Sequence, residues 1–111
     1  RLPVGQRLLA NVSMGPRVFS PNGDGINDAL RVEFDLVNVL VPRWVGLRIY
    51  NLTGRLVWVR EEAGSAGGRA LVWDGRGVGG ARVVPGIYVA ELRIDGDGGS
   101  QARRRAVSVV Y

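Results

Sequence analysis

The sequence contains neither cysteine nor histidine, and all 15 of its basic residues are arginine. Without cysteine there is no disulfide framework and no thiolate metal site. Without histidine the chain lacks the commonest general base and the usual nucleophile pairs. We therefore expect no enzyme, no catalytic residue and no small-molecule substrate. A glycosidase-like pair among the 10 acidic residues is the alternative that the sequence leaves open.

Long hydrophobic runs are also absent. No stretch of about 18 apolar residues exists, and no basic segment followed by an apolar one opens the chain, so we expect no membrane insertion. The formal net charge is +5, but the arginines are dispersed and only residues 103–105 are consecutive. Neighbours in a strand point to opposite faces, so these three do not form one patch. We expect protein partners, with copies of the same chain among them, and no nucleic acid.

Apolar residues alternate with polar ones almost throughout the chain, which favours β-strands. Its 111 residues suit one domain. Glycine, asparagine, aspartate and proline interrupt the alternation at short intervals, and no segment shows a helical period. The strand-like segments are residues 8–12, 29–38, 43–51, 54–62, 69–75, 86–95 and 102–111. We predict an all-β, immunoglobulin-like two-sheet sandwich of about seven antiparallel strands over residues 1–111, with 1–15 as an extended N-terminal arm or an edge strand.

Two resemblances to known families follow from specific motifs. The first rests on the residues at 49–51, 54–55, 73–75 and 85–88, which resemble the immunoglobulin-like domain of flagellar hook-capping proteins and of many bacterial surface proteins. The second rests on "FSPNGDGIND" at residues 19–28, which is similar to the start of C-terminal domains of gliding-motility and type IX secretion cargo proteins. Both resemblances imply a sandwich without chemistry of its own.

The resemblance implies an extracellular or cell-surface structural module for display, anchoring, adhesion or assembly. One alternative is a self-associating subunit of an extracellular filament or layer, joined by addition of a terminal strand to a neighbour's sheet. A further alternative is a type IX sorting signal domain. The chain departs from some sorting domains because "VSVVY" lacks their lysine-ended tail.

The opening loop has the spacing of a calcium site. Asn22, Asp24, the carbonyl of Ile26 and Asp28 follow the alternate-residue arrangement of an EF-hand loop. The following segment alternates like a strand and would direct Glu33 outward, so Glu33 is left out of the proposed ligands. The alternative is that asparagine and aspartate form Asx turns through backbone N–H groups, which needs no metal.

The hairpin formed by residues 43–51 and 54–62 is predicted to carry an interface. Its inward residues are expected to be Val45, Leu47, Ile49, Val57 and Val59. The outward, unusually apolar set is Trp44, Arg48, Tyr50, Leu56 and Trp58. Arg48 should stack on Trp58, which would contribute about 0.5–1 kcal/mol. Exposed aromatics with arginine are typical of contact surfaces, and the alternative is that arginine shields them from water.

Two further turns are predicted to be structural. Trp73 should fill one end of the core while Asp74 accepts backbone N–H bonds and Gly75 adopts a left-handed φ. Pro85 and Gly86 suit a type II turn. The residues expected to face the core after that turn are Tyr88, Ala90, Leu92 and Ile94.

Overall fold

A computed structural model of the chain describes residues 7–23, 25, 27–96 and 99–111. Within these residues the alternating pattern forms eight strands and no helix. The strands are β1 (Leu9–Gly15), β2 (Val18–Phe19), β3 (Leu30–Leu36), β4 (Arg43–Asn51), β5 (Leu56–Gly64), β6 (Gly67–Trp73), β7 (Gly86–Gly96) and β8 (Gly99–Val109). Across the described ranges there is accordingly no helix of the length and hydrophobicity that a membrane span requires.

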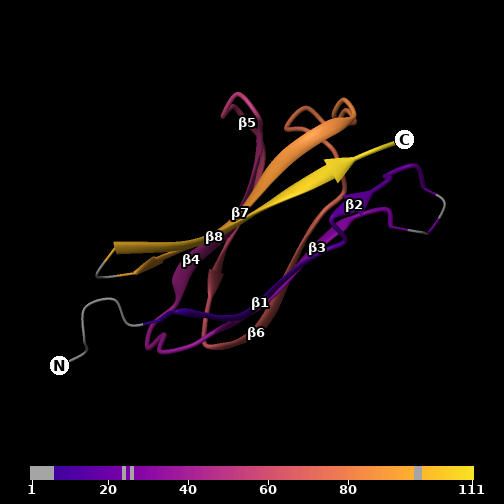
Figure 1. The fold of residues 1–111 in the computed structure, drawn as a ribbon. Helices are drawn as coiled ribbons and strands as arrows, with labels where there is room; N and C mark the ends of the chain where they lie inside the picture. The colour runs from indigo at the N-terminus through magenta and orange to yellow at the C-terminus, as the bar shows by residue number, and fades with distance from the viewer. Residues whose placement is uncertain (1–6, 24, 26, 97–98) are drawn as a thin grey trace.

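The strands form two sheets whose inner faces enclose one core (Figure 1). One sheet has three strands in the order β1-β3-β6, and the other has five in the order β2-β8-β7-β4-β5. Immunoglobulin-like sandwiches place strands B and E in one sheet and strands C, F and G in the other. Here β3 and β6 correspond to the first pair, and β4, β7 and β8 correspond to the second set. The predicted all-β, immunoglobulin-like sandwich is confirmed.

The strand β2 is an addition to the predicted set. It contains only Val18 and Phe19, and it pairs with Ser108 and Val109 of β8 in a parallel arrangement, whereas every other strand pair is antiparallel. A strand of two residues is too short to show a periodic pattern. Its position depends on β8, which lies about ninety residues later in the chain, so the local sequence does not indicate it.

Burial follows the predicted alternation in the central strands. In β3 the buried side chains are Leu30, Val32, Phe34 and Leu36. In β7 they are Tyr88, Ala90, Leu92 and Ile94, as expected. Trp73 at the end of β6 is fully buried, and its ring centroid lies 5.4 Å from that of Phe19 and 5.8 Å from that of Tyr88. This aromatic cluster packs β2, β6 and β7 together through contacts worth about 0.5–1.5 kcal/mol per pair beyond area burial.

The hairpin between β4 and β5 forms as expected, but a bulge changes its facing. Tyr50 pairs with Leu56, whereas Ile49 pairs with Trp58, so Val57 is an extra residue in β5. A bulge of one residue reverses the side-chain alternation beyond it. Trp58 therefore shares the inner face with Ile49 and packs against the core, and the prediction that it points outward is wrong.

The same bulge corrects two more predictions. Val59 pairs with Arg48 on the outer face and is exposed, so its predicted inward position is wrong. Arg48 and Trp58 consequently lie on opposite faces of the sheet, and the predicted stacking between them is also wrong. The ring that Trp58 does approach is Trp73, at a centroid distance of 6.4 Å.

The turn at Trp73–Gly75 has the predicted structural contacts. The Asp74 Oδ1 atom accepts the backbone N–H of Arg76 at 3.1 Å, and the Trp73 indole N–H donates to the Arg76 carbonyl at 2.9 Å. Gly75 has a φ of 82°, and a Cβ there would lie 2.7 Å from the Pro21 ring. The turn is therefore packed directly under the opening loop.

The predicted type II turn at Pro85–Gly86 is wrong. A type II turn needs a φ near +80° at its third residue. Gly86 has a φ of 156° and already belongs to β7, where it pairs with Val109. The chain bends at Pro85 and enters the strand directly, because β8 supplies the partner that holds Gly86 in the sheet.

Candidate interaction surface

The outer face of the five-stranded sheet carries four of the five predicted interface residues. Trp44 is 60 % exposed and Leu56 is also exposed, while Arg48 and Tyr50 are partly exposed. Leu56 lies directly opposite Tyr50 across the β4–β5 ladder. Trp44 lies further along β4, opposite Ala63, so the four side chains are spread along the hairpin and do not form one contiguous cluster.

Arg48 is held by neighbours on three strands. The Tyr50 side chain is the main reason that the pKa of Arg48 is raised, and the carboxylates of Glu61 and Glu91 act in the same direction while burial opposes them. The Arg48 Nη2 atom lies 3.8 Å from the Glu61 Oε1 atom. Arg48 is thus engaged with polar neighbours on its own face instead of stacking on an indole.

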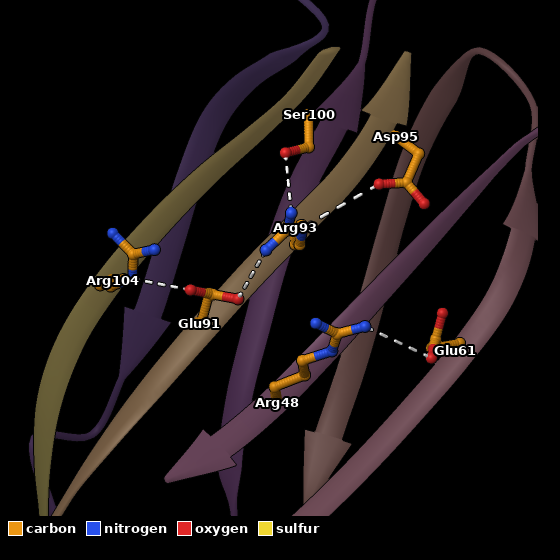
Figure 2. A network of polar contacts seen from close by, with 7 residues as sticks. All are labelled: Arg48, Glu61, Glu91, Arg93, Asp95, Ser100 and Arg104. Carbon is orange, nitrogen blue, oxygen red and sulfur yellow. Dashed lines mark hydrogen bonds and ion pairs between the residues drawn. The ribbon is translucent and has the colours of Figure 1, made fainter. Parts of the chain in front are cut away.

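A buried carboxylate lies at the centre of this face, and the sequence gives no local sign of it. Glu91 is on the outward side of β7, between Arg48 of β4 and Arg104 of β8, yet its side chain is only 4 % exposed. The Arg104 Nε atom donates to the Glu91 Oε2 atom at 2.6 Å (Figure 2). Burial of a carboxylate is tolerated here because a charged donor compensates for the lost water.

The second oxygen of Glu91 is less well satisfied. Among the described residues Oε1 has no hydrogen-bond partner, and its nearest cation is the Arg93 Nη1 atom at 3.8 Å. Figure 2 shows Arg93 above Glu91, where it also donates to Ser100 Oγ at 3.0 Å and lies 3.9 Å from Asp95. The outer face therefore carries two groups of ion pairs, one between β4 and β5 and one on β7 and β8, and the register places them side by side at Arg48 and Glu91.

The opening loop is organised by Asp28. Its two carboxylate oxygens accept the backbone N–H groups of Gly23 at 3.0 Å and Gly25 at 2.6 Å. The Ser20 N–H donates to the Asn27 carbonyl at 2.8 Å, which closes the base of the loop. The Asp28 carboxylate thus bonds backbone N–H groups three and five residues upstream, which differs from the predicted Asx turn, where a side-chain oxygen accepts the N–H two residues downstream.

Two of the four predicted calcium ligands, Asp24 and Ile26, lie outside the described residues. The other two are Asn22, whose backbone N–H donates to the Ser20 carbonyl at 2.8 Å, and Asp28. In the part of the chain that the structure describes, no three metal-binding side chains of the His, Cys, Asp or Glu type gather in one place. Both Asp28 oxygens already accept N–H donors, so its contacts favour the metal-free alternative over the predicted calcium site, which removal of calcium by a chelator can test.

The Tyr88 side chain links two segments at the same end of the sandwich. Its hydroxyl donates to the Val84 carbonyl at 2.6 Å, four residues upstream. A tyrosine near the start of strand F, which corresponds to β7 here, whose hydroxyl bonds back to the backbone a few residues upstream is the tyrosine corner of immunoglobulin-like domains. Burial raises the pKa of Tyr88, with a smaller contribution from Tyr111. The sequence marked Tyr88 only as a core residue.

Comparison with known proteins decides the family. The CHU_C type IX secretion signal domain profile matches residues 13–109, from within β1 to the end of β8. The chain belongs to this family. It is therefore a surface- or secretion-associated module, and the resemblance seen in the opening motif is confirmed. A search of curated proteins found no match.

Solved structures support the fold of this signal domain. Latent PorU from Porphyromonas gingivalis superposes with a TM-score of 0.68 at 22 % identity over 89 % of this chain and 9 % of that chain. FlgD from P. aeruginosa gives a TM-score of 0.55 at 22 % identity, covering 73 % of this chain and 62 % of that one. PorZ, described as an essential bacterial surface component of the type IX secretion system of P. gingivalis, gives 0.51 at 18 % identity, with 91 % and 12 % coverage. The signal domain thus spans less than two thirds of each of these proteins.

Proposed function

We propose that this domain is a type IX secretion signal, a folded and non-catalytic module that directs an attached polypeptide to the cell surface or the extracellular space. The observation that supports the proposal is the extent of the family match, which runs over residues 13–109 and so includes strands from both sheets. The recognised unit is then the folded sandwich, with surfaces assembled from strands distant in sequence, instead of a short linear tag.

The non-catalytic part of the proposal rests on how the acidic residues are used. A hollow of about 430 Å³ on the outer face of the three-stranded sheet is lined by residues that include Glu33 and Asp35. Glu33 Oε1 accepts from Arg31 Nε at 2.9 Å, and Asp35 Oδ2 accepts from Asn11 Nδ2 at 2.7 Å. Both carboxylates are thus bonded to neighbouring side chains and are not free to serve a bound substrate.

Among the finer roles, we favour display or anchoring of the attached polypeptide after export. The alternative, self-association in which a terminal strand of one copy completes the sheet of the next, has less support. Val110 N–H donates to the Phe19 carbonyl at 3.0 Å, and the Tyr111 hydroxyl donates to the Val83 carbonyl at 2.7 Å. The last residues are thus held on their own domain, and donating them to a neighbour would break these bonds.

A domain exchange in P. gingivalis tests the export proposal. A periplasm-targeted fluorescent reporter would carry at its C-terminus either the 111-residue chain or the structurally similar sandwich of FlgD. Because the two share a fold, the comparison separates recognition of this sequence from tolerance of any sandwich. We expect the reporter on the cell surface or in the medium only with the present chain. Equal export of both fusions, or of neither while both are folded, would contradict the proposal.

A further inference from the structure

The strand β8 has a long free edge. Its outer neighbour β2 pairs with it only at Ser108 and Val109, and no described strand covers residues 99–107 on that side. The Ser108 N–H donates toward β2, to the Arg17 carbonyl at 2.7 Å. Backbone groups alternate in direction along an antiparallel strand, so those of residues 102, 104 and 106 point to the same open side.

A basic cleft runs beside this edge, between β8 and β1. Its volume is about 300 Å³, and the residues that line it include Arg7, Arg103 and Arg105 but no carboxylate. The register places Arg103 opposite Leu92 and Arg105 opposite Ala90, so both arginines extend from the inner face of β8 at the open side of the sandwich. Alternate residues of an extended strand are about 7 Å apart, which sets the spacing of the two positive charges.

These three arginines have no ionic partner among the described residues. The Arg105 Nη1 atom donates to the Met14 carbonyl at 3.0 Å, and Arg103 Nη1 donates to the adjacent Ala102 carbonyl. Both contacts are with neutral acceptors, so they leave the charges unbalanced. Arg104, which points to the other face, is instead neutralised by Glu91.

The charge on this edge excludes one occupant and favours another. A second copy of β8 would place arginines against arginines in an antiparallel pair, and like charges directly opposite one another are destabilising. An acidic strand would place carboxylates opposite Arg103 and Arg105 while its backbone bonds the open side of β8. We propose that the β8 edge binds an acidic, extended segment of another polypeptide by strand addition.

The acidic strand within the chain itself is a poorer candidate. The edge strand β5 carries Glu at residues 61–62, but its ends are already covered. The Val57 carbonyl accepts the Val78 N–H at 3.0 Å, and the Ala63 carbonyl accepts Arg69 Nη2 at 3.1 Å. Only a short middle portion of β5 could pair with the β8 edge of another copy, so a separate acidic segment fits better.

Peptide binding to the purified 111-residue domain tests this proposal independently of export. The probe is a fluorescent peptide of about ten residues that alternates glutamate and valine, and its control alternates lysine and valine. We expect the acidic peptide to bind and Arg103→Gln with Arg105→Gln to weaken it about tenfold or more. Arg55→Gln with Arg60→Gln removes the same charge elsewhere and should leave binding nearly unchanged. Ala102→Pro removes an N–H group that points to the open side of β8 and makes no hydrogen bond to β7, so it should abolish binding.

Four peptide-binding results would overturn the proposal, provided that each variant melts as the parent domain does. The first is that the acidic peptide does not bind, and the second is that the lysine peptide binds as tightly as the acidic one. The third is that the Arg55 and Arg60 variant loses as much affinity as the Arg103 and Arg105 variant. The fourth is that Ala102→Pro binds the acidic peptide as the parent domain does. The last would indicate a general polyanion site instead of strand addition. The domain without peptide must also be tested for self-association. If it self-associates and the double variant Glu61→Gln with Glu62→Gln does not, the β8 edge binds a second copy, and the proposal is wrong.

Discussion

The Glu91–Arg104 pair predicts an asymmetric response to mutation, in which loss of the exposed partner costs more than loss of the buried one. The Arg104 side chain is 63 % exposed, whereas that of Glu91 is 4 % exposed. Replacing Arg104 removes the hydrogen bond to Glu91 and leaves a buried carboxylate whose nearest cation is 3.8 Å away. Replacing Glu91 leaves a guanidinium that water can reach.

The magnitudes follow from these burials. Threonine suits a strand at both positions and keeps the comparison matched. Arg104→Thr should lower the free energy of unfolding by about 2–4 kcal/mol, because it leaves a buried charge without a hydrogen-bond donor. Glu91→Thr should cost about 1 kcal/mol, because solvent replaces the lost partner. The double variant removes both charges and should be more stable than Arg104→Thr alone.

Urea unfolding at neutral pH, followed by tryptophan fluorescence, measures all four proteins on one scale. The signal is suited to the task because Trp58 and Trp73 pack together in the core. The reasoning would be refuted if Glu91→Thr destabilised the domain as much as Arg104→Thr. It would equally be refuted if the double variant lost the sum of the two single effects.

Three further predictions concern the end of the sandwich that carries the opening loop. Gly75→Ala should cost about 2–3 kcal/mol in urea unfolding, since alanine disfavours a φ of 82° and its Cβ would meet the Pro21 ring, and a loss under about 0.5 kcal/mol would contradict this. Because the pKa of Tyr88 is raised in the folded state, its hydroxyl loses its proton at a lower pH in the unfolded chain than in the folded domain. The free energy of unfolding should therefore be constant with respect to this group below about pH 10 and fall as the pH rises further. Tyr88→Phe should remove that alkaline loss, and an equal loss in both proteins would exclude the mechanism. Because Asp28 is satisfied by backbone N–H groups, a calcium chelator should leave the melting temperature unchanged, whereas a decrease would establish a bound ion.

The sequence was a good guide where the structure depends on local alternation and turn chemistry. The strand β3 buries its apolar residues in register, and Gly54 closes the β4–β5 hairpin with a φ of 88°. Sequence reasoning failed at Trp58, because a bulge is set by how two strands pair and not by the residues of one strand. The same limit explains why β2 was missed.

The candidate surface was harder to predict from the sequence, because it also depends on how strands pair. The alternation that directs Ala90 and Leu92 to the core directs Glu91 outward, but its side chain is buried among arginines of two neighbouring strands and of its own strand. The run at residues 103–105 was correctly read as facing two ways. Whether this run lies on a free strand edge depends on how far β2 extends along β8, and only the assembled sheet shows that.

The most direct measurement is the location of a reporter fused to this chain in P. gingivalis cells with and without PorZ, an essential surface component of the type IX system. Fluorescence and protease accessibility would be compared between intact cells, medium and periplasm. We predict that the fusion reaches the surface or medium in cells with PorZ and stays in the periplasm without it. An identical distribution in the two strains, with the fusion folded in both, would contradict its assignment as a type IX secretion signal.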